Sequence, residues 1–265
     1  MPSHRRNRDP ASSSPPEIKN GILVRACHGI EEYQACLEVE RAVWQSADID
    51  VVPIPLFVVA AETGGQVLGA FDGDRVVGFT LAIAGWRAGK PFLHSHMTAV
   101  LDGYRDRGIG RKLKLFQRED ALARGIGLIE WTFDPLIARN AYINLMRLGA
   151  IARRYMPNAY GITTSPLHSG LPTDRLVAEW HLRSARVGRV LAGKPASPAP
   201  SKKAIRITIP NTLEAGKEMS PPEAMRIQSK VRLQFLTWLH KGYAATGVAP
   251  GKMGVDYILE PWSKP

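Results

Sequence analysis

The sequence predicts an α/β fold in which a central sheet is flanked by helices and followed by a small C-terminal β-α-β appendage. Apolar strand-like runs alternate with amphipathic helical segments from Ile22 onwards, as in a sheet covered by helices. A Pro-rich stretch at 195–201 interrupts this pattern, and a second strand, helix and strand follow it. The chain has 265 residues, 45% hydrophobic and 22% charged, which suffices for one large domain with an appendage.

The N-terminal part is predicted to hold a tail, a helix and four strands. Residues 1–18 are rich in Ser, Pro and Arg without apolar periodicity, so we expect a disordered tail. A strand is predicted near 22–26 and a helix over about 30–44, where apolar residues alternate with acidic ones. Three further strands, separated by glycine-rich turns, are predicted at 56–61, 75–84 and 92–101.

The next segment completes a predicted main domain spanning 19–187. An amphipathic helix is expected from Ile109 to about Arg124, where apolar residues recur at helical spacing until Gly125 ends the helix. After it come a strand, a short helix and two further strands, predicted at 128–133, 138–148, 150–155 and 176–182.

The remaining chain is predicted to be a linker at 188–203 and an appendage at 204–265. Residues 183–203 hold six Lys and Arg and no acidic residue, which indicates a solvated basic segment. Within the appendage, a strand, a helix that begins with a capping box, and a second strand are predicted at 205–209, 221–241 and 255–259.

Composition excludes several classes of protein. The longest apolar runs are about half the roughly 20 residues of a membrane span, so no membrane protein is expected. Cys27 and Cys36 are the only cysteines, which excludes a disulfide framework and a Cys-rich zinc module. No secretory signal is visible, so we expect a cytoplasmic protein with reduced thiols. The net charge of +11 suggests an anionic partner: nucleic acid, a membrane surface or a phosphorylated cofactor.

The strongest local signal is a strand followed by Arg105-x-x-Gly108-x-Gly110 and a helix. Glycines let successive backbone N–H groups converge on one point, where the positive end of the helix dipole adds to them. Basic residues surround this turn, and together they predict a cradle for an anion such as a pyrophosphate. Leu113 stands where a dinucleotide fingerprint needs glycine, and no P-loop pattern is present.

This segment, Val100-Leu101-x-x-Tyr104-Arg105-x-Arg107-Gly108-Ile109-Gly110, resembles the acyl-CoA-binding motif of the GNAT superfamily of N-acyltransferases. The order of elements over 22–182 is similar to that fold too. The stretches 93–97, 129–135 and 170–180 resemble a GNAT group of predicted acyltransferases that carry a C-terminal segment. The resemblance implies a mixed central sheet and an acyl-CoA co-substrate, acetyl-CoA or succinyl-CoA. No metal is expected, because the sequence offers no set of ligands for one.

The resemblance also implies which residues hold CoA. Pantetheine would pair with the backbone of one strand and would be approached by a side chain from a later helix, while the glycine loop would hold the pyrophosphate. These residues are Thr98, Ala99 and Val100, then Asn140, then Arg105, Asp106, Arg107, Gly108, Ile109, Gly110, Arg111 and Lys112. Two departures from the family pattern are Asp102, where many relatives have Pro, and Asp106, where many have Gly. A third is Leu145, at the position where many GNAT enzymes carry a Tyr that protonates the leaving thiolate.

Three residues are candidates for the catalytic base that deprotonates an attacking amine: His96, Glu130 and Asp134. Strand alternation predicts that His94, His96 and Thr98 share one face, as do Glu130, Thr132 and Asp134. Each candidate has a structural alternative: an ion pair for Glu130, a hydrogen-bonded core position for His96, and a turn cap for Asp134. His94-x-His96 also fits a metal pair, but no third ligand is apparent nearby.

These features favour an acyl-CoA-dependent N-acyltransferase acting by direct attack of the amine of a small molecule, such as an amino acid. Arginines, including Arg153 and Arg154, could bind an acceptor carboxylate. The alternatives are a non-catalytic acyl-CoA-binding module and, from the positive charge, a nucleic-acid-binding protein. The basic segment 183–203 has no aromatic residues to stack on bases, which argues against nucleic acid. Membrane binding is not expected, and a homodimer is left open.

Overall fold

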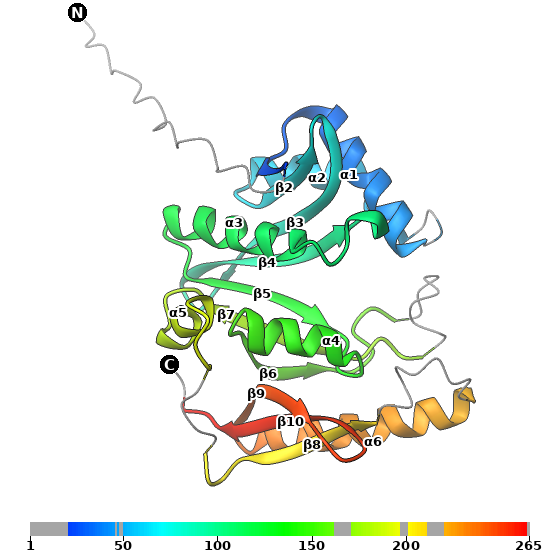
Figure 1. The fold of residues 1–265 in the computed structure, drawn as a ribbon, viewed down its shortest axis with the longest axis vertical. Helices are drawn as coiled ribbons and strands as arrows, with labels where there is room; N and C mark the ends of the chain where they lie inside the picture. Colours follow the sequence, from blue (N-terminus) through cyan, green and yellow to red (C-terminus); the bar gives the residue numbers. More distant parts are fainter. Residues whose placement is uncertain are drawn as a thin grey trace, which may run out of the picture.

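The computed structural model describes residues 21–45, 47, 50–161, 171–196, 201–210 and 220–263. One ten-stranded mixed sheet runs through it in the order β1-β2-β3-β4-β5-β7-β6-β9-β10-β8 (Figure 1). The predicted tail at 1–18 lies outside the described residues. The α/β class expected from the sequence is therefore confirmed, with a longer sheet than the elements alone suggested.

The N-terminal part contributes three antiparallel strands and two helices, which are β1 (Ile22–Ala26), α1 (Gly29–Trp44), α2 (Ile54–Glu62), β2 (Gln66–Asp72) and β3 (Arg75–Arg87). Residues of β3 contribute to two buried clusters on opposite faces, and the register with β2 shifts at Val77, which has no partner in that pairing. Phe79 and Leu81 pack with α1 and α2, whereas Val77 packs with Ile109 and Leu113 of a later helix. The sheet is thus covered on both faces here.

The strand predicted at 56–61 is wrong, because this run forms α2. Pro53 is the N-cap and Pro55 lies in the first turn, where the missing N–H of proline is not needed. Phe57 and Ala60 are buried at helical spacing. A short apolar run does not distinguish a buried strand from a buried helix, and the strand of this region is β2 instead.

The central elements are β4 (Lys90–Val100), α3 (Ile109–Ala123) and β5 (Leu128–Phe133). β4 is antiparallel to β3 and parallel to β5, but its pairing with β5 consists of Leu93 with Ile129 and His94 with Glu130. Beyond these pairs the two strands diverge toward their C-terminal ends (Figure 1). α3 begins beside the C-terminal end of β4, so the helix start and the divergence lie on the same side of the molecule.

The next elements are α4 (Ala138–Ala141), a π-helical turn (Tyr142–Arg147), β6 (Ile151–Met156), β7 (Arg175–His181) and α5 (Ala185–Leu191). The single helix predicted at 138–148 therefore changes to a π-helical turn halfway along. The expectation of a solvated linker is wrong for 185–191, because Val187 and Val190 of α5 are buried. Arg186 lies partly buried and donates to the carbonyls of Leu145, Gly149 and Thr246.

The C-terminal part is β8 (Ile205–Pro210), α6 (Pro221–His240), β9 (Tyr243–Pro250) and β10 (Gly254–Pro261). The predicted β-α-β unit lacks β9, an antiparallel partner of β10. Pairing of Ala152 with Ala245 joins β9 to β6, so the sheet continues into this part. α6 packs its Phe235 ring between Tyr155 of β6 and Tyr257 of β10. No helix among the described residues is long and apolar enough to cross a membrane.

Candidate active site

The glycine loop forms the start of α3 as expected from the sequence. Gly108 is the N-cap with φ of 75°, and Asp106 also has a positive φ, of 62°. No side chain caps the helix, and Lys112 donates the first intrahelical hydrogen bond, to the carbonyl of Gly108 at 3.0 Å. A Cβ added at Gly108 or Gly110 would meet no atom within 4 Å. The start of α3 therefore has no side-chain cap and is open at both glycines, so its first amides can bind an anion.

The charged rim of this loop is exposed and partly paired. Asp106, an acid in an otherwise basic loop, binds Arg139 of α4 at 2.5 Å, so its charge is offset by a cation. Arg105 contacts Asp102 at 2.9 Å, and the Arg107 guanidinium lies 5.2 Å from the centre of the Tyr104 ring. These contacts pair the two acidic residues with arginines and leave the rim with a net positive charge.

The strand beside the loop contains a β-bulge that the sequence pattern did not reveal. Met97 pairs with Leu81 and Ser95 with Ala82, so His96 is an extra residue on β4. His94 pairs with Ile83 and Thr98 with Thr80, and positions 83 and 80 point to opposite faces of β3. The prediction that His94, His96 and Thr98 share one face is therefore wrong. Thr98 lies on the α3 face, where its hydroxyl contacts that of Thr80.

The two histidines at the bulge remain close to each other. The rings of His94 and His96 lie 6.1 Å apart, with His96 exposed and His94 half-buried. Desolvation lowers the pKa of His96, and for His94 desolvation and the neighbouring His96 act in the same direction. Both imidazoles are therefore neutral near pH 7 and able to accept a proton.

Glu130 is buried and bound by two arginines. Its side chain is 3% exposed, and its two carboxylate oxygens accept from Arg87 at 2.5 Å and Arg154 at 2.6 Å. Glu179 of β7 lies directly opposite on the same face and is bound by Arg153. Two adjacent buried carboxylates repel each other, and the three guanidiniums offset this repulsion. Both carboxylate oxygens of Glu130 are thus occupied.

The pKa of Glu179 depends on opposing effects of burial and of its positively charged neighbours. Burial by itself raises the pKa of Glu179, but the His181 ring nitrogen 3.4 Å from its carboxylate and the hydrogen bonds from Arg153 outweigh this effect. The nearby charge of Arg154 acts in the same sense, so the pKa lies below its usual value. The carboxylate therefore stays ionised at neutral pH and holds the arginines in place.

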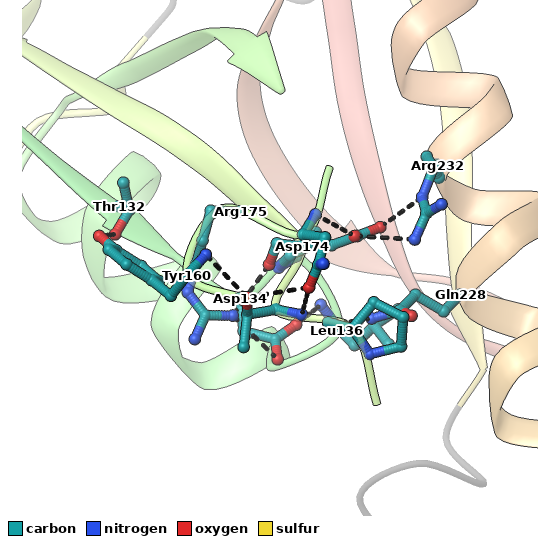
Figure 2. A network of polar contacts seen from close by, with 12 residues as sticks. Thr132, Asp134, Leu136, Tyr160, Asp174, Arg175, Gln228 and Arg232 are labelled. Carbon is teal, nitrogen blue, oxygen red and sulfur yellow. Dashed lines mark hydrogen bonds and ion pairs between the residues drawn. The ribbon is translucent and has the colours of Figure 1, made fainter. Parts of the chain in front are cut away.

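Asp134 caps a turn, which is the structural role that the sequence offered as an alternative to catalysis. One carboxylate oxygen accepts from the backbone N–H of Leu136 at 2.8 Å, and the other lies 3.7 Å from Arg175. Figure 2 shows this pair at the centre of a polar network that also contains Tyr160, whose hydroxyl contacts that of Thr132 at 2.7 Å. Asp134 is thus engaged in holding the turn after β5.

The segment directly before β7, which includes Pro172 and Asp174, belongs to the same polar network. Asp174 is fully buried and binds Arg232 of α6 through two hydrogen bonds, of 2.7 and 2.8 Å (Figure 2). Its carboxylate also accepts hydrogen bonds from the Tyr155 hydroxyl and from the backbone N–H of Asn158. A further residue of α6, Gln228, donates to the carbonyl of Pro172. The C-terminal helix is therefore tied to the end of β5 and the start of β7.

The short helix after β5 supplies the remaining predicted residues. Asn140 is half-buried in α4, whose Arg139 reaches the glycine loop. Leu145 is fully buried in the apolar core, so no acidic group stands at that position. The neighbouring Asn144 accepts from the indole N–H of Trp131 at 3.2 Å.

One buried cation was missed by the sequence reasoning. Lys114 of α3 is 8% exposed, and its ammonium donates to Ser95 at 2.7 Å and to Gln117 at 3.1 Å. It lies 4.4 Å from the centre of the Trp131 ring. Burial lowers its pKa to about 7. The spacing of Lys114, Gln117 and Ala121 could have revealed this lysine in the sequence, because it places both polar residues on the apolar face of the helix.

Comparisons with known proteins agree with this geometry. The sequence model of the acetyltransferase (GNAT) family matches residues 30–149. A protein from Desulfovibrio desulfuricans assigned to the GNAT acetyltransferases has the same fold, with a TM-score of 0.50 and 14% identity, over 61% of this chain and 99% of that one. A chain of the NatC complex bound to Gag peptide and CoA gives the same TM-score and identity, over 60% and 98%. No curated protein matches the chain.

The family match spans α1 to Gly149, and it includes the bulged β4, the glycine loop and α3. Both similar structures are covered almost completely. The elements from β6 onwards lie beyond the segment that the family model matches. Residues 30–149 of the chain thus carry a domain that matches the acetyltransferase (GNAT) family.

Proposed function

We propose that the protein is an acyl-CoA-dependent N-acyltransferase that transfers an acetyl group, or another short acyl group such as succinyl, to the amine of a small acceptor such as an amino acid. The observation that carries the proposal is the start of α3 beside the diverging ends of β4 and β5. The start of α3 offers amide N–H groups to a pyrophosphate. The diverging strand ends leave backbone groups unpaired, with which the amides of a pantetheine arm can form hydrogen bonds.

The residues present fit CoA at this junction. The exposed loop, its cations and the first amides of α3 would hold the pyrophosphate, and the paired Asp106 does not oppose this charge. The backbone of Thr98, Ala99 and Val100 would pair with the pantetheine arm, and Asn140 would lie across the divergence on α4. Bound acyl-CoA would supply an activated carbonyl on a thioester.

The base is assigned to His96 in this proposal. Its neutral, exposed imidazole can take the proton of the amine, directly or through water. Glu130 and Asp134 are better explained as positioning groups, because their oxygens already bind arginines and a turn amide. Amide N–H groups at the bulge would stabilise the negative charge that develops on the carbonyl oxygen. Attack is direct, without an acyl-enzyme intermediate.

The acceptor site is proposed on the face of Glu130. Arg87 and Arg154 are 48% and 42% exposed, while the glutamate that orients them is buried. His94 pairs with Glu130 in register, so the histidines and the arginines belong to neighbouring positions. A guanidinium that a buried glutamate holds in place, and that is partly exposed to solvent, can bind the carboxylate of a substrate. We therefore propose an acceptor amine that carries a carboxylate.

A cytoplasmic location is part of the proposal. Cys27 and Cys36 are buried thiols whose sulfur atoms lie 3.7 Å apart without forming a disulfide. Such a pair is typical of a reducing compartment.

The test has two stages. Thermal unfolding with CoA, acetyl-CoA and succinyl-CoA should show a rise of roughly 5 °C or more when ligand is at about 100 times its Kd. The best donor is then offered to amino acids and to the matching amines without the carboxylate, and CoA release is measured. We expect release with amino acids and a kcat/KM at least about tenfold lower with the matched amines. No thermal shift would contradict the proposal, and a shift without release would favour a non-catalytic acyl-CoA-binding module.

A further inference from the structure

Lys114 occupies the point at which β4 and β5 begin to separate. The last paired residues are His94 and Glu130, and the next residue on each strand is Ser95 and Trp131. The Lys114 ammonium touches both: it donates to Ser95 Oγ at 2.7 Å and lies 4.4 Å from the Trp131 ring centre. It therefore stands at the apex of the divergence, on the face covered by α3.

The surroundings of this ammonium are unusual for a structural lysine. Among the described residues, its contacts are a hydroxyl, the Gln117 amide oxygen and an indole ring, and no carboxylate binds it. Burying a cation without an anion costs free energy, so Lys114 lowers the stability of the folded protein. Groups kept at such a cost are often functional. Lysines with a lowered pKa are suited to proton transfer near neutral pH.

We propose that Lys114 is the proton donor to the sulfur of the leaving CoA, an inference that rests on the proposed function. The acceptor nitrogen forms the new C–N bond, the C–S bond breaks, and its electron pair stays on sulfur. Lys114 gives its proton to that sulfur and becomes a neutral amine, while the base removes the proton of the acceptor nitrogen. Water then returns a proton to Lys114, and the base gives its own proton to water.

The chemistry of the pair favours this transfer. A free alkyl thiol has a pKa of about 8.5, so an ammonium with a pKa of about 7 is the stronger acid of the two. Ser95 and Gln117 hold the amine in position through two of its three hydrogens. The elements around it also carry other titratable groups, which are Lys90, His94 and His96 on β4, Glu130 on β5, and Arg111, Lys112, Arg118, Glu119 and Asp120 on α3. Of these, His94 is influenced by the charge of Lys114.

The test combines Lys114→Met, Lys114→Gln and Lys114→Arg with a control, Lys241→Met, which removes another lysine that lies over an indole ring. We expect kcat with acetyl-CoA to fall about 100-fold in all three Lys114 variants, while the Kd of acetyl-CoA changes less than about threefold. Lys114→Arg keeps the charge but cannot release a proton at neutral pH. The decrease of kcat as pH rises through about 7 should disappear in Lys114→Met and persist in the control.

A second readout needs no turnover. In protein labelled with ¹³C-lysine, the NMR titration of Lys114 should shift when CoA is added, whereas that of Lys241 should not. A Lys114→Arg or Lys114→Met enzyme with kcat within about threefold of wild type would overturn the assignment. So would a Lys114 titration that CoA leaves unchanged while CoA binds. If the wild type binds no acetyl-CoA at all, the proposed function itself fails, which is a different result.

Discussion

The buried carboxylate of Glu130 suits a positioning role in the proposed site better than the role of its base. It binds Arg87 and Arg154, both partly exposed, from a position that is itself almost inaccessible to solvent. A protonatable group whose two oxygens each bind a guanidinium serves better to orient those guanidiniums than to accept a substrate proton. The residue is therefore expected to control acceptor binding.

For Glu130→Gln we predict a rise in the acceptor KM of about tenfold or more, with kcat lowered much less, because the arginines lose the anion that holds them. Stability should fall by about 1–3 kcal/mol, less than for a fully buried pair because the arginines are half-exposed. Steady-state kinetics and urea unfolding measure both quantities. A large loss of kcat with an unchanged acceptor KM would instead identify Glu130 as the base.

Lys114 carries a stability cost with a defined pH dependence. Its pKa falls from 10.5 to about 7 on folding, so between these values the unfolded chain binds a proton that the folded chain has largely released. The free energy of unfolding that depends on this group therefore increases with pH across that window, by at most about 1.4 kcal/mol per pH unit.

We predict that Lys114→Met is more stable than wild type below pH 7, and that the difference shrinks as pH rises toward 10. Urea midpoints measured at intervals between pH 6.5 and 9.5 would show this convergence. Lys241→Met provides the control, because Lys241 lies at the exposed end of α6. Parallel stability curves for wild type and Lys114→Met would contradict the buried, depressed amine.

Among the elements, α6 binds the end of β5 and the start of β7 through a buried ion pair, in addition to its apolar packing. Arg232 binds Asp174 through two hydrogen bonds, and Asp174 is fully inaccessible (Figure 2). The hydrogen bonds that Arg232 donates to Asp174 are the largest cause of the raised pKa of this arginine. Removal of the arginine leaves a buried carboxylate with the Tyr155 hydroxyl and the Asn158 amide.

Arg232→Met should therefore lower stability by about 3–5 kcal/mol and increase hydrogen exchange in α6. Arg226→Met, on an exposed position of the same helix, should change stability by less than about 0.5 kcal/mol. Urea unfolding and amide exchange test both variants. If the two variants behaved alike, the pair with Asp174 would not be what anchors α6.

The elements also show what the sequence could and could not predict. The start of α3 was predictable because glycine, cations and an amphipathic helix leave a local pattern. The helix α2 was mistaken for a strand because its run of apolar residues has no clear period, and β2 was missed beside it. The β4 bulge depends on pairing with β3, which is a non-local property, so the shared face of His94 and Thr98 could not be tested from alternation alone.

At the scale of the molecule, the sheet passes from the family domain into the C-terminal part. Strand β9 joins β6, so the predicted appendage extends the sheet, and α6 closes its core with Phe235. The candidate site was predictable as a set of residue types on β4, β5 and α3. Their partners were not, because Arg87, Arg153 and Arg154 reach the glutamates from distant positions in the chain.

The central claim is that acyl-CoA binds at the start of α3 beside the divergence of β4 and β5. The most direct measurement is a calorimetric titration of acetyl-CoA into wild type and Gly108→Val. Gly108 has a positive φ that a β-branched residue adopts poorly, and its side chain would project where the ligand approaches. We predict one site in wild type and at least about 100-fold weaker binding in a variant that remains folded. Equal affinity in the two proteins, or no binding to wild type, would contradict the account.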